Sequence, residues 1–213
     1  MPLSAYYAVD VKTLLKKMSS KQIDHMIGVG IYAGIMAQKM NNCRFYADCL
    51  TQRQIEQIAE AAFYHDIGKV WLPQEICERC APLTPVDRLT VKQHTLLALR
   101  LFDFMDHRII LGMPSSLMPI AADAAVYHHE HWDGNGYPFG LCGDNIPLIA
   151  RITAICDFYD KETAQKENDH RTVCRNILQA AGTQFDPTLV RVFIRYNTAF
   201  SSAFLKYRNS DWF

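Results

Sequence analysis

The sequence predicts a single all-α domain, and three observations support this fold class. Apolar residues recur at intervals of three and four along most of the 213-residue chain, which is the spacing of one face of a helix. Typical helix starts, such as Thr84 before Pro85 and Asp186 before Pro187, precede several of these stretches. No stretch shows the strict alternation that is typical of a half-buried strand. We therefore expect a bundle of about seven to eight helices.

The first half of the chain is expected to form four helical segments. Ser20 is placed to cap the second of them, in which His25 lies beside the apolar stripe. Thr51 opens the third segment, and His94 faces inward from the fourth. The four segments cover residues 9–18, 21–40, 51–66 and 85–105.

Three further helices are expected in the second half, starting near residues 114, 146 and 186. The first ends in the pair His128–His129, and a polar, glycine-rich loop over residues 130–145 follows it. The second carries Asp157, and the third is expected to reach Phe200. The predicted division of the chain is an N-terminal helical segment (1–20), a catalytic domain (21–200) and a tail without a readable pattern (201–213).

Composition narrows the classes of function. Lys and Arg number 22 and so do Asp and Glu, so no broad surface for a nucleic-acid polymer or a membrane is expected. The sequence shows neither a signal peptide nor an apolar run of the ~20 residues that a membrane span needs. Seven cysteines, an odd number scattered through helical stretches, favour a reducing compartment. We therefore expect a cytoplasmic protein.

The end of the third helix carries the clearest chemistry. His65 and Asp66 are neighbours, about 100° apart on a helix, so both side chains can face one point near its end. Imidazole and carboxylate together suit a divalent metal, and a carboxylate can bridge two ions. Gly68 is expected to let the chain leave the helix, and Lys69 to place a charge beside a bound phosphate. An isolated pair of this kind is more often a core His capped by a neighbouring Asp.

Seven candidate ligands are expected to face the core, and five of them are histidines. Burying so many polar groups costs free energy unless each finds a partner, which favours metals over a set of unrelated core histidines. Nitrogen and carboxylate ligands without thiolate suit Fe, Mn or Zn, and the set is too large for one ion. Two ions about 3.5–4 Å apart are a recurrent device for phosphoester hydrolysis. The candidates are His25, His65, Asp66, His94, His128, His129 and Asp157.

The motifs in this sequence resemble those of the HD-GYP family of cyclic di-GMP phosphodiesterases. The resemblance covers about residues 21–196, and the long motif over residues 128–151 makes it specific. The matching stretches, in order, are His65-Asp66-x-Gly68-Lys69, Lys92-Gln93-His94, His128-His129-Glu130-x-x-Asp133-Gly134-x-Gly136-Tyr137-Pro138, Gly140-Leu141-x-Gly143, Ala150-Arg151-Ile152, Asp157-x-Tyr159-Asp160 and Gly182-Thr183-x-Phe185-Asp186-Pro187.

The resemblance implies an HD-domain helical bundle with two divalent ions as cofactors, Fe or Mn by analogy with the family. A water between the ions would attack the phosphorus of cyclic di-GMP in line, giving pGpG and, with further hydrolysis, GMP. Asp66 would bridge the two ions. One ion would be held by His25, His65, Asp66 and Asp157, and the other by His94, His128 and His129.

The resemblance also assigns contacts to the substrate. Lys69 would act beside Asp66 in catalysis by neutralising charge on the phosphate oxygens. Arg151 is either a second phosphate contact or a structural residue, and Arg171 would reach the phosphates. Tyr137 would touch the substrate edge or a protein partner at the Gly-Tyr-Pro loop. Self-association into a homodimer is compatible with the sequence.

Two departures from the family pattern affect these expectations. Some relatives have a Glu one turn before the first ligand His, where it supports a third ion; this chain has Lys21, so two ions are expected. The segment over residues 161–171 is shorter and altered. It supports the alternative of an HD-type phosphohydrolase of another nucleotide. A module that binds cyclic di-GMP or a partner without catalysis is the third reading, disfavoured because every ligand position is filled.

Overall fold

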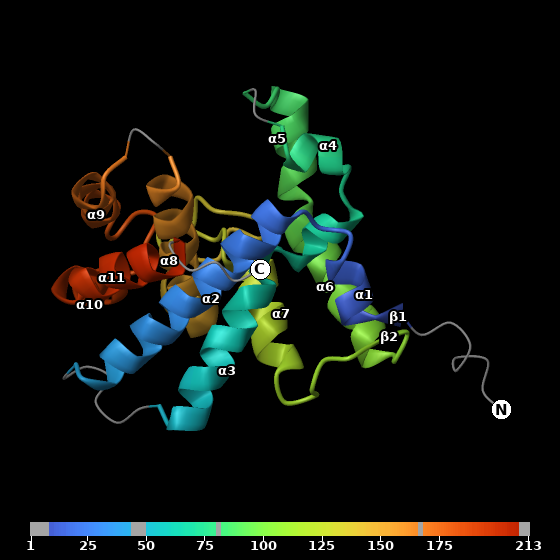
Figure 1. Cartoon of the computed structure of the whole chain (residues 1–213), viewed down its shortest axis with the longest axis horizontal. Coiled ribbons are helices and arrows are strands. Elements are labelled where there is room, and N and C mark those ends of the chain that lie inside the picture. The colour runs from blue at the N-terminus through green and yellow to red at the C-terminus, as the bar shows by residue number, and fades with distance from the viewer. Residues whose placement is uncertain (1–8, 44–49, 80–81, 166–167, 209–213) are drawn as a thin grey trace.

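The computed structural model describes residues 9–43, 50–79, 82–165 and 168–208, and its helices pack around one continuous hydrophobic core (Figure 1). The prediction of an all-α fold is confirmed. The helices are α1 (Val11–Leu15), α2 (Ser20–Asn41), α3 (Gln52–Phe63), α4 (Gln74–Cys77), α5 (Pro85–Lys92), α6 (His94–Asp106), α7 (Met118–Tyr127), α8 (Leu148–Thr163), α9 (His170–Gln179), α10 (Pro187–Arg195) and α11 (Asn197–Arg208), with the 3-10 helices η2 (Tyr64–Trp71) and η3 (Gly143–Asn145).

Helix α2 runs through the centre of the fold, between α3 and α8. Its N-cap is Ser19 rather than Ser20, because the Ser19 hydroxyl and the Gln22 side chain satisfy each other's backbone N–H groups in a capping box. Gly30 lets α3 approach closely, since a Cβ there would lie 2.9 Å from the carbonyl oxygen of Ala59. This close packing holds α2, which carries His25, against the helix that leads to His65.

Two of the helices expected in the first half are broken. The third α-helix ends at Phe63, and the chain continues to Trp71 as the 3-10 helix η2, which contains His65 and Asp66. The expected helix over residues 85–105 divides at Gln93 into α5 and α6. Apolar spacing alone does not distinguish these breaks from one continuous helix.

Gly68 does not release the chain from a helix, contrary to the expectation from sequence. It lies inside η2, and a Cβ at this position would overlap the carbonyl oxygen of His94. The glycine is required because η2 and the first turn of α6 touch backbone to backbone. This contact brings His94 next to Asp66.

The C-terminal part contains more helix than expected. Helix α9 begins at the end of the altered segment and continues to Gln179, and α11 crosses the predicted boundary at residue 200. Phe200 is fully buried, with its ring packed against Tyr32, Tyr159 and Phe193. The first residues of the predicted tail therefore continue a helix that is anchored in the core, and α9, α10 and α11 group together at one end of the molecule (Figure 1).

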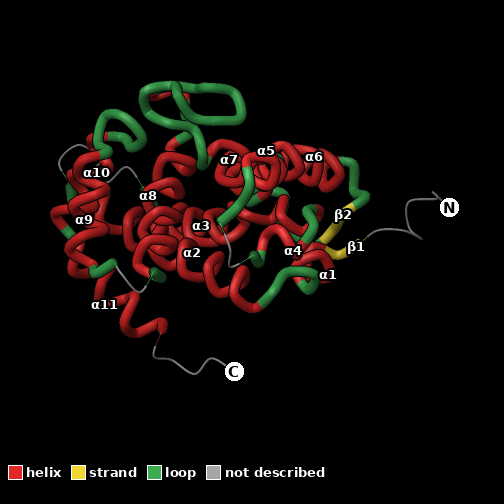
Figure 2. The backbone as a smooth tube through the Cα atoms, turned by 90° about the horizontal axis from the view of Figure 1, so that it is seen from above, coloured by secondary structure: helices red, strands yellow, loops and turns green. Residues whose placement is uncertain are grey.

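A pair of two-residue strands also forms, which the sequence did not indicate. Strand β1 (Val9–Asp10) pairs in parallel with β2 (Ile110–Leu111), at the opposite end of the molecule from α9 (Figure 2). The strands are too short for an alternating pattern to be visible. Among the described residues, no helix combines the length and hydropathy that crossing a membrane requires.

Candidate metal centre

The seven candidate ligands converge from five elements on one place in the core. Helix α2 supplies the first, η2 the next two, α6 one, the end of α7 two and α8 the last. Their ligand atoms form overlapping groups in which all atoms lie within 4.8 Å of one another. The groups are His25, His65 and Asp157; His94, His128 and His129; and His65, Asp66 and His128.

The first cluster joins α2, η2 and α8. The Nε2 atoms of His25 and His65 lie 3.2 Å apart. Oδ1 of Asp157 is 2.9 Å from Nε2 of His25 and 3.4 Å from Nε2 of His65. Two imidazole nitrogens and one carboxylate oxygen therefore face a common point, as one divalent cation requires.

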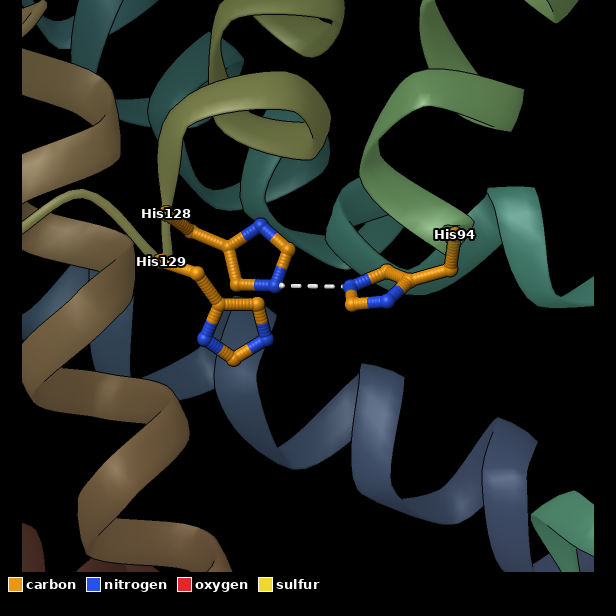
Figure 3. A group of neighbouring side chains, drawn as sticks. All are labelled: His94, His128 and His129. Atoms are coloured by element: carbon orange, nitrogen blue, oxygen red, sulfur yellow. Dashed lines mark hydrogen bonds between the residues drawn. The ribbon is translucent and has the colours of Figure 1, made fainter. Parts of the chain in front are cut away.

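The second cluster consists of imidazoles (Figure 3). His94 projects from the start of α6 toward His128 and His129 at the end of α7. The Nε2 atoms of His94 and His128 are 3.4 Å apart. The ring of His129 has its centroid 4.1 Å from that of His128 and 5.1 Å from that of His94.

Asp66 lies between the two clusters with one oxygen toward each. Its Oδ2 is 3.4 Å from Nε2 of His65 and faces the first cluster, whereas Oδ1 is 3.4 Å from Nε2 of His94 and faces the second. The carboxylate is 2% exposed. This is the placement that a carboxylate bridging two ions would need.

Backbone hydrogen bonds prepare three of the imidazoles for a cation. Nδ1 of His65 donates to the carbonyl oxygen of Ala62 (2.9 Å), and Nδ1 of His128 donates to that of Ala124 (2.9 Å). Nδ1 of His94 donates to the carbonyl oxygen of Val91 (2.6 Å). A carbonyl oxygen can only accept, so Nδ1 carries the proton and Nε2 is the nitrogen available to a metal.

The buried carboxylates show the same need for a cation. Oδ1 of Asp66 and Oδ1 of Asp157 are buried, and neither has a hydrogen-bond partner among the described residues. A buried oxygen without a partner destabilises the fold unless an ion or a water molecule pairs with it. The donor set of imidazole and carboxylate, without thiolate, fits Fe, Mn or Zn. The residues present therefore fit a two-metal centre.

The two clusters differ in protonation. Burial lowers the pKa of His94 to about 4 and holds the pKa of His128 and His129 well below the usual range, so these imidazoles are neutral at pH 7. For His65, burial also acts to lower the pKa, but Asp66 and Asp157 outweigh it and raise the pKa to about 9. His65 is therefore protonated at pH 7 and supplies a positive charge within the first cluster.

Two lysines pair with the carboxylates of the centre. Lys69, one turn after Asp66 in η2, places Nζ 2.5 Å from Oδ2 of that residue. Lys161 places Nζ 2.8 Å from Oδ2 of Asp157. Sequence reasoning selected Lys69 and missed Lys161, although its spacing of four residues from Asp157 on one helix is the spacing that brings side chains together.

Asp160 is a second residue whose role the sequence did not reveal. It is 3% exposed, and its Oδ2 accepts a hydrogen bond of 2.7 Å from Nδ1 of His25. The bond leaves Nε2 of His25 pointing into the first cluster. Asp160 follows Asp157 by three residues on α8, so a position on the same face of the helix was the available signal.

The loop after α7 contacts the second cluster through the ring of Tyr137. The Glu130 carboxylate accepts hydrogen bonds from the backbone N–H groups of Phe139 and Leu141, at 2.7 and 3.0 Å, and so fixes the loop. Tyr137 stacks on His129 with ring centroids 4.7 Å apart. It therefore lies beside the centre, as expected for a residue at the substrate edge.

Two predicted substrate contacts are not brought to the centre. Arg151 forms ion pairs of 2.8 Å with Asp144 and 2.9 Å with Asp186, so its guanidinium fixes the loop and the start of α10. Arg171 is on α9 and lines a hollow of about 490 Å³ that contains none of the seven ligands. The ion pairs favour the structural alternative for Arg151, and the position of Arg171 on α9 does not support a phosphate contact.

The profile of the HD domain family matches residues 10–189. A probable cyclic di-GMP phosphodiesterase of Vibrio cholerae is 34% identical over 175 residues, which are 80% of this chain and 39% of that protein. A 3'3'-cGAMP-specific phosphodiesterase of the same organism is 30% identical over 151 residues, covering 69% of this chain and 27% of the relative. The chain thus spans less than half the length of either relative.

A solved structure shows the same fold. The crystal structure of a cyclic GMP-AMP specific phosphodiesterase from V. cholerae superposes with a TM-score of 0.59 and 16% identity, over 94% of this chain and 51% of the other. The profile match covers most of the residues, and the motifs around His65 and Tyr137 lie within it. The chain belongs to the HD-domain family and, within it, to the HD-GYP group.

Proposed function

We propose that this chain is a metal-dependent phosphodiesterase that opens cyclic di-GMP to pGpG and can hydrolyse pGpG further to GMP. The observation that carries the proposal is Asp66, a buried carboxylate with one oxygen toward each of two clusters of metal-ligand type. The relatives named cyclic di-GMP phosphodiesterases support the substrate class.

The residues of the chain would have the following roles in metal binding and catalysis. One ion would be held by His25, His65 and Asp157, the other by His94, His128 and His129, and Asp66 has one oxygen toward each group. When bound, the two ions supply a nucleophilic water of lowered pKa and stabilise the charge of the phosphodiester. Lys69 holds its ammonium at Asp66, where it can stabilise negative charge that develops on the phosphate oxygens.

We infer two ions of Fe or Mn. Seven ligands divided into two clusters support two positions. Lys21, which stands where some relatives have a third-ion ligand, is exposed at the start of α2. The neutral imidazoles of the second cluster suit Fe, Mn and Zn by donor type, and the family resemblance favours the first two.

Hydrolysis of another cyclic dinucleotide is the second candidate. The 30% identical relative named for 3'3'-cGAMP supports it, and so does the departure of residues 161–171 from the family pattern.

A protein partner at the Gly-Tyr-Pro loop, or a second copy of this chain, is supported by Phe139, whose exposed fraction is 53% although it is a large apolar residue.

Turnover of cyclic di-GMP tests the proposed function. The protein is purified without air, stripped with a chelator and loaded separately with Fe(II) and Mn(II), and the products are separated by chromatography. We expect pGpG to appear with metal and to be absent after chelation. Asp66→Ala should reduce turnover by at least about a hundredfold, because it removes the bridge between the ions.

The control is Asp103→Ala, which removes an exposed carboxylate whose partner is His107 on the surface. Its turnover should equal that of the wild type. Bound metal with intact cyclic di-GMP would overturn this substrate, and the same samples with 3'3'-cGAMP would then decide whether the second candidate replaces it.

A further inference from the structure

Lys161 lies on the outer side of a carboxylate that faces the first cluster. Oδ1 of Asp157 points toward His25 and His65, and Oδ2 of the same carboxylate accepts the Lys161 ammonium at 2.8 Å. The Lys161 side chain is 40% exposed, whereas the Lys69 side chain is 15% exposed. Lys161 therefore combines contact with a candidate ligand and access from solvent.

Cation binding would change the charge balance around this ammonium. In the metal-free protein the Asp157 carboxylate neutralises Lys161, and the Asp66 carboxylate neutralises Lys69. A divalent ion is the largest local charge in such a site, so carboxylates that ligate it no longer balance the lysines fully. Both ammonium groups then become available to a new anion. The carboxylate of the neighbouring Asp160 already accepts a hydrogen bond from Nδ1 of His25.

Three other basic residues, Arg151, Arg171 and Lys92, have partners or positions away from the first cluster. Arg151 is paired with Asp144 and Asp186. Arg171 lines the separate hollow on α9. Lys92 lies over the ring of Tyr137, 4.6 Å from its centroid, on the side of the second cluster.

We propose that Lys161 binds the phosphate of a cyclic dinucleotide that is not being cleaved. The inference rests on the proposed function and extends it to the second half of the substrate. A cyclic dinucleotide has two phosphodiester groups in one ring; when one is at the ions beside Lys69, the other needs a cation at the rim. Lys161 supplies a point charge of the kind that binds phosphate, from the altered segment that follows Asp160.

A comparison of two substrates tests this role with Lys161→Met, which keeps an unbranched side chain, one atom shorter, and removes the charge. We expect KM for cyclic di-GMP to rise about tenfold, with kcat changed less than about twofold, because a uniform binding contact is lost. Bis(p-nitrophenyl) phosphate has one phosphodiester group, so its kinetic constants should not change. Metal content by elemental analysis should equal that of the wild type.

Two further variants control the comparison. Lys161→Arg keeps the charge and should restore most of the affinity. Lys39→Met removes a lysine from α2 at a distance of about 21 Å along the helix from His25, at 1.5 Å rise per residue, and should leave both substrates unaffected.

The outcomes separate this inference from the proposed function. Loss of metal from Lys161→Met, or an equal loss with both substrates, would overturn phosphate binding and make Lys161 a positioning residue for Asp157. Unchanged KM for cyclic di-GMP would also overturn it while hydrolysis stands. If metal-loaded wild type binds cyclic di-GMP without hydrolysis, calorimetry should show weaker binding by Lys161→Met. If it neither binds nor hydrolyses a cyclic dinucleotide, both proposals fall.

Discussion

The histidines of the centre are oriented by what their second nitrogen contacts. Three Nδ1 atoms donate to backbone carbonyl oxygens, and Nδ1 of His25 donates to the Asp160 carboxylate. A carboxylate in this position fixes the ring and raises the basicity of the metal-binding nitrogen. Asp160 therefore acts on a metal position without contacting it.

Asp160→Asn should weaken metal binding at the first cluster by about 10- to 100-fold, because the amide is a weaker acceptor for Nδ1 of His25 than the carboxylate. The measurement is a titration of the stripped protein with Mn(II) in competition with a chelator. Asp103→Asn, on the surface of α6, is the matched control and should bind as the wild type does. Equal affinities in all three proteins would show that Asp160 does not position His25.

At the scale of residues, the sequence identified candidate ligands that the fold brings together, but it did not identify the residues that orient them. The ligands lie on inward helix faces and in motifs that can be read locally. His25 and Asp160 are 135 residues apart, so their hydrogen bond depends on how α2 meets α8. For Arg151 the sequence left a phosphate contact and a structural role open, because its position in the motif does not show Asp186, the carboxylate that pairs with it in the fold.

At the scale of elements, the contact of η2 with α6 determines the distance between the two clusters. The 3-10 helix turns His65 and Asp66 into the core directly after α3. Gly68 lies against the backbone of His94, so Asp66, the candidate bridging carboxylate, is held next to the first histidine of the second cluster. Neither the 3-10 helix nor the break before α6 could be read from apolar periodicity, because both keep the same residues inward.

Gly68→Ala should destabilise the protein by about 3 kcal/mol or more, since the added methyl group has to displace α6. Urea unfolding of the metal-free protein gives the free energy of unfolding, and elemental analysis shows whether the second ion is lost. Gly34→Ala on α2 is the comparison: its Cβ would lie 3.1 Å from the Cβ of Ala59, and helix propensity favours alanine by about 1 kcal/mol. If the two variants unfold alike, backbone contact at Gly68 is not essential.

For the whole molecule, the charged and neutral histidines predict how stability depends on pH. The folded state raises the pKa of His65 from 6.5 to about 9, so between these values it keeps a proton that the unfolded state has lost, and stability falls as pH rises. His94 has its pKa lowered from 6.5 to about 4, so in that window the unfolded state binds the extra proton and stability falls as pH drops. The metal-free protein should be most stable near pH 6.5.

Thermal unfolding from pH 4 to 9 in the presence of a chelator tests this expectation. A midpoint that keeps rising from pH 6.5 to 9 would contradict the assignment of a proton to His65. With metal bound, that proton is displaced, and the decline on the alkaline side should disappear.

The overall architecture was largely predictable, because apolar residues at helical spacing or recognisable helix starts mark α2, α3, α6, α7, α8 and α10. Helix α9 was missed although the sequence carries a signal for it: Asp169 is its N-cap, and Val173 and Ile177, four residues apart, are its buried positions. The pairing of Val9 with Ile110 depends on contacts across a hundred residues, which local sequence does not encode.

The distribution of ligands over five elements has a consequence for folding. The donors at residues 25, 65, 94, 128 and 157 are separated along the chain by tens of residues, so bound ions would close several long loops at once. The ions would bind the folded chain and not the unfolded one, because only the fold brings these donors together. Bound metal would therefore raise the free energy of unfolding, and its removal would lower it. Metal supply would determine both whether the centre can react and the lifetime of the folded state.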